Sequence, residues 1–157
     1  MAVTIREANL ADAPVICEYN RRLAQESEGK TLEPAIVAKG VAAVLSDAAK
    51  GRYFVAEEHQ EVVGQIMIAR EWSDWRNAWM WWIESVYVRA DARRRGIFRA
   101  LYEHVYQAAC EDPTVVGLRL YVERDNHAAQ QTYLRLGMEP MGFLMFHKFP
   151  LPKRRNF

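Results

Sequence analysis

The feature that most constrains the fold of this chain lies at residues 83–108, where an apolar run is followed by a turn and then by a helical pattern. The run from Ile83 to Val88 is rich in apolar and β-branched residues, which predicts a buried strand. A basic turn containing Gly96 follows, and apolar residues then recur at helical spacing at Ile97, Leu101, Val105 and Ala108. A strand that enters a helix through such a turn directs unpaired backbone N–H groups and the positive end of the helix dipole toward one point. Because diphosphates bind at such points, the segment predicts a site for a phosphate-bearing cofactor.

Length and composition are typical of one globular domain over residues 1–157. The 21 Lys and Arg residues balance 20 Asp and Glu residues, so we expect neither nucleic acid nor an anionic membrane as a partner. No apolar run approaches the roughly 18 residues that a membrane-spanning helix needs, and Met1 to Arg6 lacks the apolar core of a secretory signal. Cys17 and Cys110 are far apart in sequence, which fits reduced thiols better than a disulfide. We therefore expect a cytoplasmic protein.

Hydrophobic periodicity and turn residues predict elements in the order βααβββαβαβ. We expect strands at 3–6, 52–57, 62–69, 77–88, 118–123 and 142–148, with a loop over 72–77. We expect helices from Asn9 or Asp12 to about 27, from about 34 to 49, from about 96 to 110, and from 128 to 136. Strands grouped between helices predict the α+β class, with a mixed, mostly antiparallel sheet and helices on both of its faces. No repeat, low-complexity segment or linker divides the chain, which favours a single domain.

Two motifs occur in order along the chain. The apolar triplet Val86-Tyr87-Val88 precedes Arg93-Arg94-Arg95-Gly96-Ile97-Phe98, and later Asn126 stands seven residues before Tyr133, with Gly137 closing the short helix. In both motifs, and over essentially its whole length, the chain resembles the GNAT superfamily of N-acetyltransferases. The first family motif reads Arg/Gln-x-x-Gly-x-Gly/Ala after a strand that ends in apolar-x-Val. The resemblance implies a GNAT-like acyl-CoA N-acyltransferase fold and acetyl-CoA as the cosubstrate.

The resemblance also implies which residues contact acetyl-CoA. The N–H groups from Arg94 to Arg99 would hold the diphosphate, with Gly96 allowing a close approach. The strand Val86 to Val88 would pair with the pantetheine amides as if the cofactor were another strand. The implied contact residues are Val86, Tyr87, Val88, Arg93, Arg94, Arg95, Gly96, Ile97, Phe98, Arg99, Asn126 and Tyr133. A solvated basic face and a plain buried strand are the alternative interpretations of these segments.

Phe98 departs from the family motif, because a Gly or Ala is usual at its position. A small residue there lets the pyrophosphate approach the backbone closely. We expect the Phe98 side chain either to point away from the turn or to reshape the site, with cofactor affinity as the property at stake.

The resemblance implies two catalytic groups besides the cofactor site. Tyr133 would donate a proton to the departing thiolate, a transfer that needs modest tuning because a thiol has an unperturbed pKa of ~8.5 and a phenol one of ~10. The alternative is a core or rim tyrosine with its hydroxyl in water. A backbone N–H near Val86, freed where the family strands splay at a bulge, would polarise the thioester carbonyl. Asn126 would cap the helix that carries Tyr133 and contact the pantetheine arm, although capping alone explains an asparagine there equally well.

Glu84 is the candidate general base that deprotonates the acceptor amine. It lies in an otherwise apolar strand, two residues before Val86, and strict alternation would place both on one face unless a bulge intervenes. Burial among aromatic residues would raise the pKa of its carboxyl toward neutrality. The alternatives are a solvated carboxylate, one paired with an arginine such as Arg76, and Glu123 as the base.

The acceptor is predicted to be a small cationic amine. The segment from Trp82 to Val88 after a long hairpin is similar to that of spermidine/spermine acetyltransferases, which also place a glutamate two residues before the apolar triplet. Loop residues Trp72 and Trp75 could bind a cation through their rings, or simply pack. The acidic residues either attract the amine or form a solvated acidic loop; they are Glu26, Glu28, Glu33, Asp74 and Glu84. The four histidines have no metal-ligand spacing, so we expect no metal.

Two other classes of function stay open from sequence alone. One is a catalytically silent CoA-binding regulatory module, which Phe98 favours. The other is a nucleic-acid-binding domain that uses Arg93 to Arg95 with Lys153 to Arg155, which the near-neutral charge disfavours. A homodimer is also consistent with the sequence, with the apolar stretch from Phe143 to Phe149 as its interface.

Overall fold

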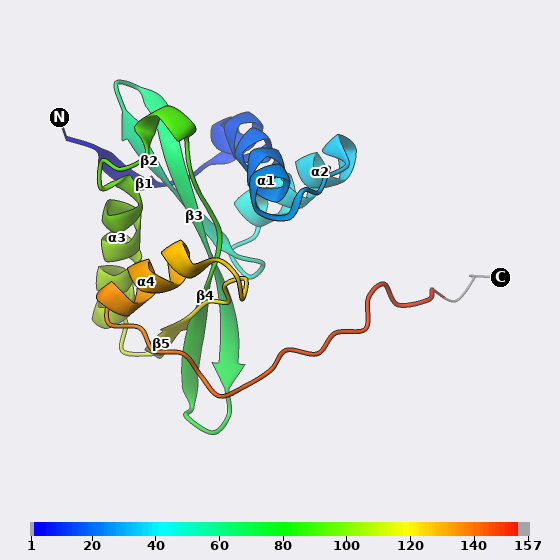
Figure 1. Cartoon of the computed structure of the whole chain (residues 1–157), viewed down its shortest axis with the longest axis vertical. Helices are drawn as coiled ribbons and strands as arrows, with labels where there is room; N and C mark the ends of the chain where they lie inside the picture. The colour runs from blue at the N-terminus through cyan, green and yellow to red at the C-terminus, as the bar shows by residue number, and fades with distance from the viewer. Residues whose placement is uncertain (1, 154–157) are drawn as a thin grey trace. The chain divides into compact units, whose positions relative to one another are not determined.

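The computed structural model describes residues 2–153 (Figure 1). Arg154 and Arg155 of the basic C-terminal run therefore lie outside the described residues, as does Met1. The chain divides into two compact units, Met1–Leu120 and Tyr121–Phe157. The first unit contains the sheet and three of the α-helices, and the second contains the short helix with Tyr133.

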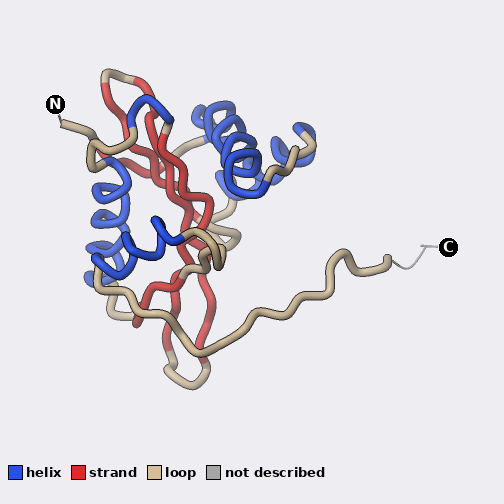
Figure 2. Tube along the Cα trace, viewed as in Figure 1, coloured by secondary structure: helices blue, strands red, loops and turns tan. Residues whose placement is uncertain are grey.

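Five strands of the first unit form one sheet in the order β1-β2-β3-β4-β5, seen as the red core of Figure 2. The strands are β1 (Thr4–Glu7), β2 (Arg52–Glu58), β3 (Glu61–Ser73), β4 (Ala78–Val88) and β5 (Val115–Arg119). The first four pair antiparallel with their neighbours, whereas β5 runs parallel to β4. The predicted mixed, mostly antiparallel sheet is confirmed.

Helices cover both faces of this sheet (Figure 1). They are α1 (Ala13–Glu28) and α2 (Pro34–Ser46) on one face, and α3 (Ile97–Glu111) on the other. Alternation along β2 explains the division, because Tyr53 and Val55 pack with residues of α1 and α2 while the Phe54 ring lies 5.1 Å from that of His104 on α3. The α+β class with helices on both faces is therefore confirmed.

The start of α1 is fixed by a capping box and an ion pair. A 3₁₀ turn, η1 (Leu10–Asp12), precedes the helix, and Asn9 Oδ1 accepts a hydrogen bond from Ala11 N at 2.9 Å. Asp12 Oδ2 accepts in return from Asn9 N at 2.8 Å, which completes the capping box. The guanidinium of Arg6 binds both oxygens of Asp12 at 2.9 Å and so lowers the pKa of that carboxyl. Asn9 thus caps the 3₁₀ turn, whereas Asp12 is the N-cap residue of α1 and makes no side-chain cap hydrogen bond there.

The second unit contains α4 (His127–Arg135), whose two ends follow the sequence motif. Asn126 Oδ1 accepts from Ala129 N at 3.1 Å and caps the helix. Gly137, at φ 86°, follows its last turn in the left-handed conformation that favours glycine.

Several predicted boundaries differ from the structure, and one predicted strand is wrong. β5 ends at Arg119 rather than at residue 123, and the loop at 72–77 shortens because β3 continues to Ser73. The expected strand at 142–148 is absent, since the part of the second unit that the structure describes contains no strand. A strand requires a hydrogen-bonded neighbour as well as β-forming residues, and none of the five described strands pairs with this segment.

None of the helices within residues 2–153 combines the length and apolar character needed to cross a bilayer.

Candidate active site

A β-bulge interrupts β4 at Ser85 and Val86. Gln65 of β3 pairs with Tyr87, and Met67 pairs with Glu84, so Ile66 alone lies opposite two residues of β4. Ser85 adopts a left-handed backbone at φ 50°, which is uncommon for a residue other than glycine. The bulge that the family resemblance implied near Val86 is present.

The bulge changes which face of the sheet Glu84 occupies relative to its neighbours. Because paired residues point to the same side, Glu84 lies on the face of Met67, and Tyr87 lies on the face of Gln65. Gln65 and Met67 are two residues apart and share a face, so Glu84 and Tyr87 share it too. The alternation expected to align Glu84 with Val86 is therefore broken, and Glu84 faces the side that α1 and α2 cover.

Beyond Trp82 the outer edge of β4 has no strand beside it in the described part of the chain. β5 pairs with β4 only from Trp79 to Trp82, because β5 ends at Arg119, the partner of Trp82. Residues 83–88 therefore present backbone N–H and C=O groups along this edge, including those at the bulge. Such an edge can accept an extended amide-containing chain as an added strand.

Glu84 is half-buried, and burial raises the pKa of its carboxyl above the ordinary glutamate value. Among residues 2–153 no ion pair of Glu84 is found, and Arg76, the partner considered from sequence, donates instead to Ser73 Oγ at 3.2 Å. The pKa shift has the direction that a general base requires. The interpretation of Glu84 as an arginine-paired carboxylate has no support.

The basic turn after β4 contains two residues with a left-handed backbone, Arg94 at φ 63° and Gly96 at φ 78°. Gly96 is the N-cap residue of α3. No heavy atom lies within 4 Å of the position that a Cβ at Gly96 would occupy, so backbone conformation, rather than crowding, requires glycine. The first amides of α3 have no acceptor within the helix, as at any helix start.

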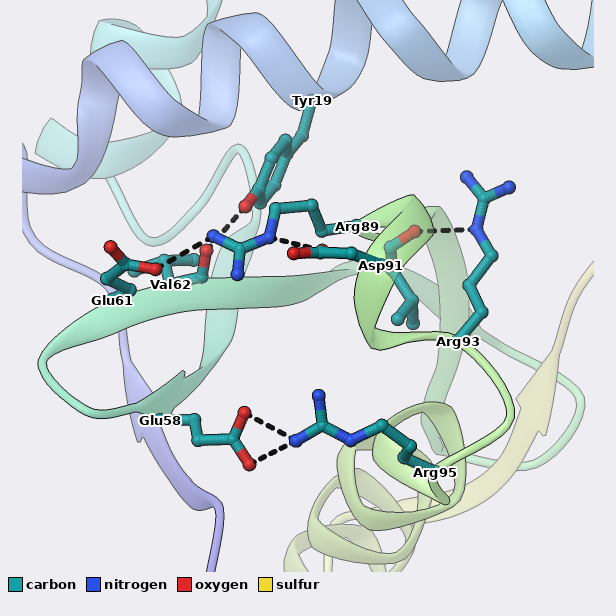
Figure 3. Close-up of polar contacts among 9 residues, drawn as sticks. Tyr19, Glu58, Glu61, Val62, Arg89, Asp91, Arg93 and Arg95 are labelled. Carbon is teal, nitrogen blue, oxygen red and sulfur yellow. Dashed lines mark hydrogen bonds and ion pairs between the residues drawn. The ribbon is translucent and has the colours of Figure 1, made fainter.

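Most arginines around this turn are neutralised by carboxylates, and Figure 3 shows the ion pairs of Arg89 and Arg95. Arg93 pairs with Glu26 of α1 at 3.0 Å, and its Nε donates to the Val88 carbonyl at 2.9 Å. Arg95 pairs with Glu58 at the end of β2. The other pairs join Arg89 to Glu61 and Asp91, and Arg99 to Glu103.

Arg94 differs from its neighbours, because none of the ion pairs found within residues 2–153 involves it. The arginine run is therefore not a uniform basic face. Arg93 and Arg95 tie the turn to α1 and β2, whereas Arg94 remains an exposed cation.

Aromatic rings link α1 to the end of β4 and to the turn. The rings of Tyr19 and Tyr87 lie 5.0 Å apart, and the guanidinium of Arg93 lies 5.3 Å from the Tyr87 ring. The Tyr19 hydroxyl also donates to the carbonyl of Val62 on β3. These contacts hold α1, β3 and the turn together.

Phe98 is half-buried on the flank of α3, one turn before Tyr102, and the two ring centroids are 6.3 Å apart. The ring is thus accommodated along the helix. Its effect on cofactor affinity stays a prediction.

The remaining sequence-predicted site residues belong to the second unit. Tyr133 is half-buried on α4, and burial raises the pKa of its hydroxyl. Glu123 is exposed, and its backbone carbonyl accepts from Gln130 Nε2 at 3.3 Å. Asn126 engages its side chain in the cap of α4. The predicted residues thus divide between β4 with its following turn and the region around α4.

The tryptophan cluster is partly structural and partly exposed. Trp81 is buried, and Trp79 meets Trp72 edge-on at 4.9 Å while the guanidinium of Arg70 lies 4.6 Å from the Trp79 ring. Trp75 is 90% exposed at the hairpin turn. Packing therefore explains part of the cluster, and Trp75 is available to a partner or ligand.

The acidic residues expected near the acceptor are partly neutralised, since Glu26 pairs with Arg93 and Glu28 lies 3.6 Å from Lys30. No group of three or more metal-ligating side chains occurs in the described residues.

Sequence reasoning did not single out Asn20, Tyr53 and Gln65, which lie beneath the bulge. The available signal was the amide of Gln65, which interrupts the otherwise apolar run from Val62 to Ile68. Burying an amide in such a run costs free energy unless the amide forms hydrogen bonds, so Gln65 is expected to form them.

A protein-family model and solved structures match the chain across this strand–turn–helix arrangement. A model of the acetyltransferase (GNAT) family matches residues 16–138, a span that includes the bulge, the basic turn and Tyr133. The chain belongs to the GNAT family. No protein of curated function matches it.

Solved structures share this GNAT fold. A possible acetyltransferase from Clostridium difficile 630 is 41% identical, with a TM-score of 0.91 over 97% of this chain and 100% of that one. A ribosomal-protein-alanine N-acetyltransferase from Brucella melitensis biovar Abortus 2308 is 19% identical, with a TM-score of 0.77 over 95% and 100%. A predicted acetyltransferase with acetyl-CoA from Clostridium acetobutylicum is 14% identical, with a TM-score of 0.77 over 94% and 96%. The two lower identities show the fold alone.

Proposed function

We propose that this GNAT protein transfers the acetyl group of acetyl-CoA to a primary amine, by direct attack of the amine in a ternary complex. The observation that carries the proposal is the succession, along one strand and the turn after it, of a bulge, an open edge and left-handed Gly96. The bulge matches the thioester of the cofactor, the open edge matches the pantetheine arm, and the turn at Gly96 matches the diphosphate. The acetyl-CoA named with a structure of the same fold supports this assignment.

The cofactor is bound mainly through the backbone. The amides from Arg94 to Arg99, together with the α3 dipole, bind the diphosphate, and the Arg94 side chain adds a free positive charge. The open edge at Val86, Tyr87 and Val88 pairs with the pantetheine amides. The family resemblance assigns Asn126 and Tyr133 to cofactor binding as well.

Glu84 acts as the general base, directly or through a water molecule. The amine must lose a proton because an ammonium ion has no lone pair. Since burial raises the pKa of the Glu84 carboxyl, its carboxylate is a stronger base than an exposed glutamate. The backbone N–H near Val86 stabilises the negative charge that develops on the thioester oxygen.

Tyr133 donates the proton to the departing thiolate. The raised pKa of its hydroxyl keeps this group protonated through neutral and mildly alkaline pH. No metal takes part in the proposed transfer.

A small cationic amine, such as a polyamine, is the proposed acceptor. The exposed ring of Trp75 offers a cation–π contact, and Glu84 supplies negative charge. The local similarity to spermidine/spermine acetyltransferases supports the same class. We place the protein in the cytoplasm as a single-domain enzyme with no nucleic-acid or membrane partner. The exposed apolar side chains of the segment from Phe143 to Phe149 support a homodimer.

Release of free thiol from acetyl-CoA tests the proposal. Purified protein is assayed against polyamines, amino acids, aminoglycosides and peptides with a free N-terminus, with the amine omitted as the control. We expect amine-dependent thiol release, fastest with polyamines. Binding of acetyl-CoA without thiol release for any amine would instead support a silent CoA-binding module.

A further inference from the structure

A chain of partly buried hydrogen bonds runs from α1 through the sheet to the bulge in β4. Asn20 Nδ2 donates to the Tyr53 hydroxyl at 3.0 Å, and Asn20 Oδ1 accepts from Gln65 Nε2 at 2.7 Å. Gln65 Nε2 also donates to the Ser85 carbonyl at 3.0 Å. The polar groups of α1, β2 and β3 are thus linked in series, and the series ends at the Ser85 carbonyl.

Packing does not explain a glutamine at position 65. Its side chain is completely buried, and its Oε1 has no hydrogen-bond partner among the described residues. Burying an unsatisfied amide oxygen is unfavourable, so a methionine of similar volume would suit a purely structural role better. The Nε2 group of Gln65 donates to two acceptors, Asn20 Oδ1 and the Ser85 carbonyl. Position 65 therefore requires a hydrogen-bond donor.

The acceptor that Gln65 binds is the residue under backbone strain. Ser85 has φ 50°, a conformation that a residue with a Cβ adopts only when its surroundings enforce it. Its carbonyl bonds to the Gln65 side chain. Gln65 therefore holds the backbone of Ser85, and Asn20 in turn holds the amide of Gln65.

We propose that Asn20 and Gln65 are positioning residues that keep Ser85 left-handed and so fix the bulge that aims the Val86 N–H and the Glu84 carboxylate. This inference rests on the proposed acetyl transfer for its kinetic consequences. Without these hydrogen bonds, Ser85 can relax to an extended backbone. The bulge, in which Ser85 and Val86 lie opposite the single residue Ile66, is then no longer held in place. Tyr87 and Val88 of the open edge and the diphosphate turn at Gly96 all lie beyond the bulge, so cofactor binding is largely retained.

The test is Gln65→Met, which removes the donors at nearly constant volume. We expect kcat to fall by about 10–100-fold, the loss typical of misplaced reacting groups. The dissociation constant for acetyl-CoA, measured by calorimetry, should stay within about threefold of wild type, and the thermal midpoint should not fall. The backbone amide resonances of Ser85 and Val86 should shift.

Two further variants separate positioning from packing. In Gln65→Met/Ser85→Gly, glycine adopts the left-handed backbone at no steric cost, so kcat and the Val86 amide resonance should move back toward wild type. Ile68→Val on the same strand should lower the thermal midpoint while leaving the Val86 resonance in place.

Two outcomes would overturn the inference: wild-type kcat and an unmoved Val86 resonance in Gln65→Met, or no recovery in the double variant. The resonance can be read without any turnover. Failure of the proposed acetyl transfer is therefore distinguishable from failure of the positioning role.

Discussion

Glu84 and Tyr133 are the two side chains whose ionisation controls the proposed reaction, and burial raises the pKa of both. Their required forms are opposite, since the base acts as a carboxylate and the acid as a protonated phenol. A raised glutamate pKa means that activity falls as the pH drops through that pKa. A raised tyrosine pKa means that the acid stays protonated well above neutrality. The proposed reaction therefore works between the raised pKa of Glu84 and the raised pKa of Tyr133.

Glu84→Gln should slow acetyl transfer most at low pH. A general base contributes about 10²–10⁴-fold, and its contribution matters most where free amine is scarce. We expect a loss of about 100-fold at neutral pH that shrinks as the pH approaches the pKa of the amine. Glu123→Gln, which changes the other candidate, is the comparison. An unchanged pH–rate profile in Glu84→Gln would move the role to Glu123 or to no residue.

Tyr133→Phe should lower kcat by about 100-fold with little change in the affinity for acetyl-CoA. The ring and its packing remain, and only the proton donor is lost. Rates across pH and a calorimetric titration measure the two properties separately. Wild-type turnover at every pH would exclude Tyr133 from the mechanism.

Arg94→Ala should weaken acetyl-CoA binding by about tenfold and reduce the salt dependence of binding. Arg94 is the arginine of its run without an ion pair among the described residues, so its charge is free to meet a phosphate. Titrations at low and high ionic strength measure both effects. Arg76→Ala, which removes an exposed charge at the β3–β4 turn, is the control. Equal losses in the two variants would show that Arg94 acts only through overall charge.

At the scale of elements, the end of β4 and the turn that connects it to α3 supply most of the proposed cofactor site. Gly96→Ala adds a side chain to a left-handed residue at φ 78° and should cost about 1–2 kcal/mol of stability. It should also weaken acetyl-CoA binding, because the strained turn can relax and misalign its amides. Denaturation and calorimetry measure the two effects.

Gly29→Ala is the matched control, because Gly29 at φ 63° ends α1 with the same open surroundings. It should lose similar stability but keep its affinity for acetyl-CoA. If both variants bound the cofactor as wild type does, the turn would not be the diphosphate site.

The sequence predicted those elements whose own residues show hydrophobic periodicity or mark the ends of a helix. The helix of α3 and the strands of the β2–β3 hairpin follow from periodicity, and Asn126 and Gly137 mark the ends of α4. The strand expected at 142–148 failed because pairing depends on a distant partner. The bulge at Ser85 and the ion pairs of Arg93 and Arg95 likewise depend on residues far away in sequence, such as Gln65, Glu26 and Glu58.

At the scale of the whole molecule, a five-stranded mixed sheet carries α1 and α2 on one face and α3 on the other. This arrangement presents Glu84 and the bulge on β4 and the basic turn directly after it. The GNAT family match and the 41% identical Clostridium difficile structure agree with this frame. A nucleic-acid-binding role has little support, because carboxylates already neutralise Arg93 and Arg95.

Calorimetric titration of the folded, full-length protein with acetyl-CoA is the most direct measurement of whether the Gly96 turn holds a cofactor. We predict saturable binding of one molecule per chain, which is lost or weakened in Gly96→Ala and retained in Gly29→Ala. A complete absence of saturable heat, from protein that circular dichroism shows to be folded, would contradict the assignment of the turn and the acetyl transfer that depends on it.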